Sequence, residues 1–201
     1  MTRIIGGAAG GRRLRTPPGD ATRPTSDRVR EALFSALEAQ LGSLHGVRFL
    51  DLYAGSGAVG LEAGSRGAGA LTLVESDRRT ARLIEENARV VGVAAQVLAQ
   101  PVSRVLASAP ATPYDVVFAD PPYPLTEDEL AADLAALVGN DWLGPGATVV
   151  VERSRRSVEP AWPPGLGTPR MKKYGETVLW YVRRAQPDDR PDDGSAGEAE
   201  E

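Results

Sequence analysis

The fold of this chain is decided by residues 49–60, which read FLDLYAGSGAVG. The apolar start of this segment predicts a buried strand, and the glycines that follow predict a tight turn that opens a helix. Gly55, Gly57 and Gly60 match the pattern G-x-G-x-x-G, which is typical of dinucleotide-binding α/β folds but is a weak sign when it stands alone. The segment therefore predicts the first strand, turn and helix of an α/β domain.

A carboxylate follows the next predicted strand. Glu75 ends the apolar run 71–74, twenty residues after Gly55. In this position a carboxylate can bind both hydroxyls of an adenosine ribose, as in NAD and S-adenosylmethionine sites. Asp51 helps to separate the two, because an acid just before the glycines would repel a pyrophosphate and favour an ammonium and a sulfonium. The alternatives that stay open are an NAD-type unit and a glycine turn without a ligand.

A second motif, Asp120-Pro121-Pro122-Tyr123, closes the apolar run 114–119. The two prolines fix φ near about −65° and remove two backbone N–H donors. What remains is a carboxylate, carbonyl oxygens and an aromatic plane, which together can accept hydrogen bonds from an amino group and stack on a flat ring. The implied substrate is the exocyclic amine of a nucleobase, and hydride transfer has no use for such a motif.

These four residues are the predicted catalytic residues of a methyl transfer. If Asp120 and the Pro121 carbonyl accept both amine hydrogens, the nitrogen lone pair points at the methyl group, and the same acceptors stabilise the developing positive charge. Tyr123 would stack on the base once the base has left its own stack. The alternative for Tyr123 is a core aromatic residue at a strand end.

Composition narrows the class of protein. With 201 residues, 42% of them hydrophobic, the chain can form one α/β domain with a substantial core. The absence of cysteine excludes disulfides, thiolate zinc sites and the cysteine nucleophile of pyrimidine C5 methylation. With His45 as the single histidine we expect no metal site. No membrane span or signal region is visible, so we expect a cytoplasmic protein without a membrane partner.

Charge is distributed unevenly along the chain. The net charge is −4, but residues 186–201 contain seven acids and one arginine, so the remaining residues carry −4 minus −6, or +2. The first thirty residues contain seven arginines and two acids. A basic segment of this kind is expected of a surface that meets phosphates, although a solvated arm is the alternative. The acidic tail is expected to be disordered.

Strands and helices alternate after residue 47. Strands are predicted near 48–52, 70–75, 96–99, 114–119 and 147–152, and helices near 58–66, 78–91, 102–108 and 126–138. Two short strands are predicted within 3–7 and 11–14, a helix with Thr25 or Ser26 as cap follows, and residues 170–174 and 177–182 predict an antiparallel hairpin.

This order predicts an α/β, Rossmann-like class I methyltransferase fold. Its mostly parallel seven-stranded sheet would end in an antiparallel hairpin. We expect a small basic β-hairpin extension at 1–24, the methyltransferase domain at 25–185 and the tail at 186–201.

From about Arg3 to Arg184 the chain resembles the bacterial guanine-N2 methyltransferases of small-subunit (16S) ribosomal RNA, the RsmD-like family. The matching stretches include 3–7, 23–31, 50–57, 74–77 and 120–123, and the block RPTSDRVRE at 23–31 is the most specific of them. The resemblance implies S-adenosylmethionine as methyl donor. It implies as acceptor a guanine of small-subunit rRNA, including rRNA within a partly assembled 30S particle.

The motifs and the resemblance together give the expected binding residues. The cofactor is expected to contact Asp51, Tyr53, Ala54, Gly55, Gly57, Glu75, Ser76, Gln100 and Asp120. At Gln100-Pro101 many relatives have an acidic residue or Asn followed by Ala, so this chain departs from the family there. RNA is expected to contact Arg12, Arg13, Arg15, Arg23 and Arg28. For Arg23 and Arg28, ordinary helix-start chemistry is the alternative.

Other functions remain as alternatives. An adenine-N6 DNA methyltransferase could use the same tetrapeptide. Only about the first 45 residues precede the alternating strands and helices of the predicted catalytic domain, however, which leaves little for a target-recognition region. Methylation of a protein glutamine is disfavoured by the basic segment. A non-catalytic ribosome-assembly factor is disfavoured because Asp120 and Glu75 are intact.

Overall fold

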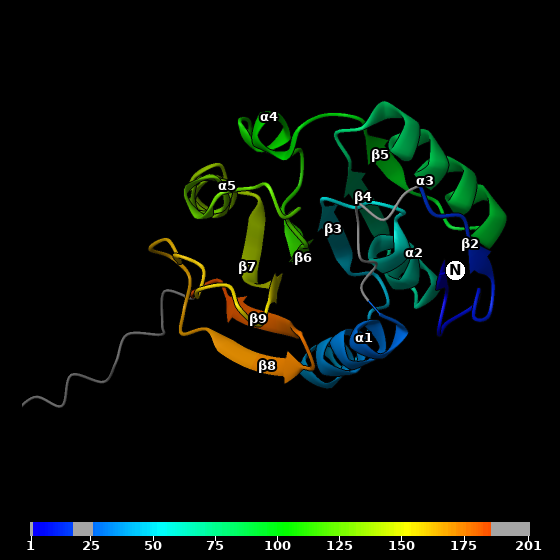
Figure 1. Cartoon of the computed structure of the whole chain (residues 1–201), viewed down its shortest axis with the longest axis horizontal. Helices are drawn as coiled ribbons and strands as arrows, with labels where there is room; N and C mark the ends of the chain where they lie inside the picture. Colours follow the sequence, from blue (N-terminus) through cyan, green and yellow to red (C-terminus); the bar gives the residue numbers. More distant parts are fainter. Residues whose placement is uncertain (1, 18–25, 186–201) are drawn as a thin grey trace, which may run out of the picture.

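A seven-stranded sheet forms the centre of the molecule (Figure 1). The computed structural model describes residues 2–17 and 26–185. The strands are β1 (Thr2–Arg3), β2 (Arg13–Leu14), β3 (Arg48–Leu52), β4 (Ala70–Val74), β5 (Gln96–Leu98), β6 (Tyr114–Ala119), β7 (Leu143–Ser154), β8 (Arg170–Tyr174) and β9 (Thr177–Arg183). The helices are α1 (Asp27–Leu41), α2 (Ala58–Ser65), α3 (Arg78–Val91), α4 (Val102–Leu106) and α5 (Glu127–Gly139).

The strand order in this sheet is β5-β4-β3-β6-β7-β9-β8. The five strands from β5 to β7 run parallel, whereas β9 is antiparallel to both β7 and β8. This topology confirms the predicted fold. The chain builds outward from β3 to β5 and then returns to place β6 on the other side of β3. Ligands of open α/β sheets bind at such a switch point, beyond the carboxyl ends of the strands.

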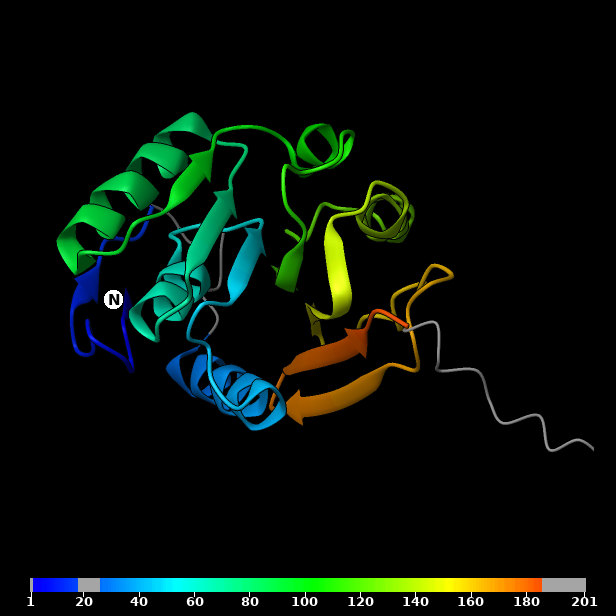
Figure 2. The same cartoon turned by 180° about the vertical axis from the view of Figure 1, so that it is seen from behind.

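Helices lie on both sides of the sheet (Figure 2). Each face of the sheet carries its own apolar cluster. On one face, residues of α1, α2 and α3 pack against side chains such as Phe118 and Val150. On the other face, α4 and α5 cover Val117 and Val149. Neighbouring residues of a strand point to opposite faces. These clusters therefore show which face of the sheet the buried apolar residues of each strand point to.

Helix α1 begins as the sequence predicts. The Ser26 side chain caps it by accepting a hydrogen bond from the Val29 backbone N–H, at 3.3 Å. Val29, Leu33, Phe34 and Leu37 are buried and form the apolar stripe that packs on the sheet. Thr25, the other predicted cap, lies outside the described residues.

The N-terminal hairpin joins the main core. Ile4 and Leu14 are buried in the cluster beneath α1, and the N–H groups of Ile5 and Gly6 donate to the Glu62 carboxylate of α2, at 2.7 and 2.8 Å. The paired strands are shorter than predicted, since the N–H groups of Ile5 and Gly6 donate to Glu62 rather than to a partner strand. The segment predicted as an extension is thus anchored to the main domain through its buried residues, Ile4, Ala9 and Leu14.

Within residues 2–17 and 26–185, no helix is long and apolar enough to cross a membrane. The acidic tail at 186–201 lies outside the described residues, so its predicted disorder stays a prediction.

Candidate active site

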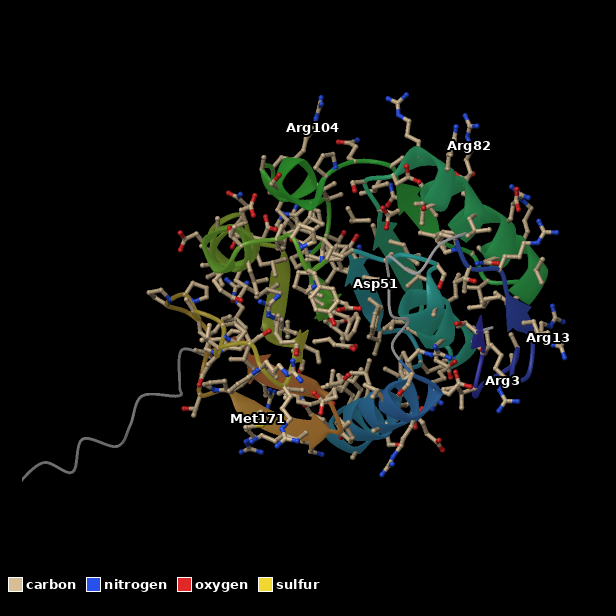
Figure 3. The ribbon with its side chains drawn as sticks, in the orientation of Figure 1. Arg3, Arg13, Asp51, Arg82, Arg104 and Met171 are labelled. Carbon is tan, nitrogen blue, oxygen red and sulfur yellow. The ribbon has the colours of Figure 1, made fainter. Side chains whose placement is uncertain are left out.

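A cleft of about 1730 Å³ lies at the carboxyl ends of β3, β4, β6 and β7. Figure 3 shows Asp51 at the centre of the molecule, with Arg13 and Arg104 at its periphery. Most of the residues predicted to bind cofactor or to catalyse methyl transfer line this cleft: Asp51, Tyr53, Ala54, Gly55, Glu75, Ser76, Asp120, Pro121, Pro122 and Tyr123. The fold therefore brings the two sequence motifs together.

The glycine-rich turn places the backbone close to the neighbouring strand and helix. Gly57 has a φ of 79°, and a Cβ there would lie 3.0 Å from Ile84 and 3.2 Å from Leu73. Only glycine accepts this conformation without strain or a shift of its neighbours. Gly57 is not among the residues that line the cleft, so it shapes the turn without facing the cleft itself.

Asp51 is buried at the end of β3, with 1% of its surface exposed. Its carboxylate accepts a hydrogen bond from the Gly60 N–H at 2.8 Å. Burial raises the pKa of Asp51 to about 7, and the nearby Glu75 charge adds to this, while the Gly60 hydrogen bond acts against it. A cationic ligand beside so deeply buried a carboxyl group would lower its pKa again and stabilise its charged form.

Glu75 is fixed by two backbone donors. One carboxylate oxygen accepts from the Gly55 N–H at 3.0 Å, and the other accepts from the Asp77 N–H at 2.8 Å. The carboxylate is therefore held beside the glycine-rich turn, with further lone pairs to accept from ribose hydroxyls. Asp77 caps α3 through the Thr80 N–H at 2.8 Å.

The tetrapeptide forms one wall of the cleft. Asp120 is half-buried and Pro121 is buried, whereas Tyr123 is 79% exposed. The alternative that Tyr123 packs in the core is therefore wrong. Burial raises the pKa of Asp120 well above its usual value, the charges of Glu152 and Asp51 raise it further, and Arg153 opposes them.

The cleft is also lined by residues that were not predicted from the sequence, among them Asp133, Glu152 and Arg153. The Tyr53 hydroxyl donates a hydrogen bond to Asp133 of α5, which ties the turn after β3 to that helix. Glu152 and Arg153 line the cleft from the end of β7, and Arg153 is paired with Glu127. An acidic residue at the end of a buried strand was the available sequence signal for Glu152.

The structure does not gather all the predicted RNA-binding arginines at the cleft. Arg12 donates to the Val90 carbonyl at 2.6 Å, and Arg15 pairs with Glu86 at 3.0 Å, so both are held against α3. Arg13 and Arg28 are exposed. Arg23 lies outside the described residues. Their contacts with RNA stay predictions, since none of these four described arginines lines the cleft.

Gln100 is exposed and does not line the cleft, whereas its neighbour Pro101 does. Its predicted contact with the cofactor therefore stays a prediction. Within residues 2–17 and 26–185, no group of three or more His, Cys, Asp or Glu side chains is arranged to hold a metal ion.

Comparison with known proteins gives a consistent result. Residues 2–183 match the family described as Conserved hypothetical protein 95. The chain is 38% identical over 186 residues to Ribosomal RNA small subunit methyltransferase D of Escherichia coli, an alignment that covers 92% of this chain and 91% of the relative.

Solved structures share the fold. A structure described as putative methyltransferase yhhF from Escherichia coli has a TM-score of 0.80 and 34% identity, and covers 91% of this chain and 97% of its own. The Thermus thermophilus 16S rRNA N2 G1207 methyltransferase in complex with AdoMet and guanosine has a TM-score of 0.63 and 20% identity. That alignment covers 84% of this chain and 45% of its own, and it supports the fold alone.

Proposed function

The chain belongs to the Conserved hypothetical protein 95 family, and we propose that it is an S-adenosylmethionine-dependent RNA methyltransferase. Its acceptor is the exocyclic N2 amine of a guanine in small-subunit (16S) ribosomal RNA. The observation that carries this proposal is that Asp51, Glu75 and Asp120 line one cleft. Asp51 and Glu75 are placed to bind the methyl donor, and Asp120 is placed to accept from an amino group of the acceptor.

The residues of the cleft fit the methyl donor. S-adenosylmethionine supplies an electrophilic methyl group on a sulfonium. Buried Asp51 offers a negative charge to the cationic amino-acid part, and Glu75, already held by the Gly55 N–H, accepts from the ribose hydroxyls. The open space at Gly55, where a Cβ would meet no atom within 4 Å, leaves the turn accessible to the ligand.

Asp120 and the Pro121 carbonyl orient the acceptor amine. The lone pair of a guanine amine is delocalised into the ring, so the nitrogen is a poor nucleophile. Acceptors for both hydrogens favour a pyramidal nitrogen and stabilise the positive charge that develops on it. Alignment of donor and acceptor contributes several kcal/mol, up to about 7–11 in ideal cases. Exposed Tyr123 provides the aromatic plane on which the base stacks.

The proposal is tested with tritiated S-adenosylmethionine and small subunits isolated from cells that lack the modification. We expect label in the 16S rRNA with the wild-type protein and none with Asp120→Ala. The matched control is Asp128→Ala, an exposed residue of α5 that does not line the cleft, and it should retain wild-type labelling. Label in ribosomal proteins instead of RNA would contradict the proposal.

A further inference from the structure

Glu152 lies level with Asp120 on the neighbouring strand. In the parallel pairing of β6 and β7, Ala119 is opposite Val151, so the next residues, Asp120 and Glu152, come side by side just beyond the end of β6. Adjacent strands are about 4.8 Å apart. Glu152 is 8% exposed and lines the same cleft. Two carboxylates therefore stand next to each other in the wall that receives the acceptor base.

Both carboxylates point to the same face of the sheet. Phe118 and Val150 belong to the cluster beneath α1, and Glu152, two positions after Val150 on β7, shares that side. Asp120 follows β6 directly, two positions after Phe118, and lines the same cleft as Glu152. The influence of the Glu152 charge on the pKa of Asp120 agrees with this closeness. Asp120 and Glu152 thus form a pair that can accept two hydrogen bonds from one edge of a base.

The Watson–Crick edge of guanine matches such a pair. Guanine presents two adjacent donors there, the N2 amine and N1–H, whereas adenine presents an amine next to N1, which is an acceptor. Enzymes that read a flipped base use hydrogen bonds to this edge. A carboxylate beside the one that binds the amine would accept from guanine N1–H and would repel the N1 lone pair of adenine.

We propose that Glu152 selects guanine by accepting a hydrogen bond from its N1–H while Asp120 accepts from the N2 amine. This inference rests on the proposed function and explains why this cleft takes guanine rather than adenine, which the tetrapeptide alone does not decide. Sites built to hydrogen-bond one polar group reject analogues that lack it far more strongly than apolar pockets reject a change of size.

A structural role for Glu152 is the competing explanation. Arg30 of α1 is fully buried, and Glu152 is one of three acids whose charge acts on it, with Asp27 and Glu62. If Glu152 serves only to balance Arg30, its replacement should slow the reaction of every base equally. If it reads the base, the ratio between two bases should change. The ratio therefore separates the two roles.

The test compares guanine with 2-aminopurine, which keeps the 2-amine but has an unprotonated N1. Once the modified guanine has been located, 16S rRNA carrying either base at that position is prepared by splinted ligation and assembled into subunits. We expect wild-type kcat/KM to favour guanine by at least tenfold. In Glu152→Gln the amide can donate to N1 of 2-aminopurine, so this preference should fall at least tenfold.

Two controls keep the test decisive. Glu129→Gln changes another cleft carboxylate, on α5, and should leave the preference unchanged. Glu152→Asp keeps the negative charge and should preserve the preference at a lower rate.

An unchanged ratio of kcat/KM for guanine and 2-aminopurine in Glu152→Gln would overturn the role of Glu152. A wild-type protein that methylates both bases equally would do the same. Loss of RNA methylation by the wild-type protein would instead contradict the proposed function. If Glu152→Gln does not fold, the guanine preference of the wild-type protein and of Glu152→Asp still tests the role of Glu152.

Discussion

Glu75 accepts a hydrogen bond from the Gly55 backbone N–H at 3.0 Å and so joins the end of β4 to the glycine-rich turn after β3. The same carboxylate therefore holds the turn and also lines the cleft in which we place the ribose. Damage to this contact should change cofactor binding more than it changes the fold, since both elements are also held by the parallel pairing of β3 and β4.

We expect Glu75→Ala to weaken S-adenosylmethionine binding at least tenfold, which corresponds to about 1.4 kcal/mol. The ribose would lose its proposed acceptor, and the Gly55 N–H loses its partner. Isothermal titration calorimetry measures the change. The matched control is Glu85→Ala, an exposed residue of α3 that does not line the cleft. Equal affinities for wild type and Glu75→Ala would remove this residue from the cofactor site.

Asp51 should lower stability at neutral pH. Its pKa is about 7 in the folded protein, whereas an aspartate in the unfolded chain keeps its ordinary pKa of 3.8. Ionisation of Asp51 therefore favours the unfolded chain. The contribution of protonated Asp51 to the free energy of unfolding is complete below pH 3.8, and it is lost as the pH rises toward 7. We expect Asp51→Asn to increase the free energy of unfolding by about 1–3 kcal/mol at pH 8, with a smaller gain at pH 5. Urea unfolding at both pH values provides the measurement.

The Asn amide oxygen can still accept from the Gly60 N–H, so the comparison isolates the charge. A gain that does not depend on pH would contradict this assignment of the ionisation.

The same carboxylate should make cofactor binding depend on pH. Because the cationic donor favours ionised Asp51, wild-type affinity for S-adenosylmethionine should rise as pH increases from 6 to 8. In Asp51→Asn, affinity should be lower and this rise should be reduced. The same slope in both proteins would mean that another group is responsible.

Asp120→Ala should abolish turnover while the affinity for S-adenosylmethionine stays within tenfold of wild type. In the proposed mechanism the removed carboxylate acts on the acceptor amine, whereas Asp51 and Glu75 hold the donor. Single-turnover rates and equilibrium binding separate the two effects. Near-normal turnover would refute the catalytic role of Asp120.

Arg12→Ala combined with Arg13→Ala should weaken RNA binding and reduce its salt dependence. Each lost phosphate contact lowers the slope of log K against log salt by about 0.7–0.9. Because Arg12 also donates to the Val90 carbonyl, circular dichroism must first show that the hairpin region remains folded. If affinity falls without a change in slope, the arginines act on structure rather than on phosphates.

The regular elements could be predicted because local patterns determine them. Helix α3 and strands β3 and β6 have the predicted boundaries, since their apolar spacing and flanking turn residues are clear. Strand β7 was predicted from 147 but begins at Leu143, because pairing with Tyr114 of β6 extends it through a Gly-Pro-Gly segment. That pairing is a tertiary contact that no local pattern reveals.

The site was predicted in part for the same reason. Asp51, Glu75 and Asp120 each follow an apolar run, so their places at strand ends could be read from the sequence. The partnership of Tyr53 with Asp133 joins residues eighty positions apart, and the position of Glu152 beside Asp120 depends on strand register. Both required the assembled sheet.

The central claim is most directly tested by the identity of the methylated base. Undermodified small subunits are incubated with the wild-type protein and labelled S-adenosylmethionine, and the RNA is digested to nucleosides and resolved by mass spectrometry. The account predicts N2-methylguanosine at one position of 16S rRNA. Label in N6-methyladenosine would contradict it.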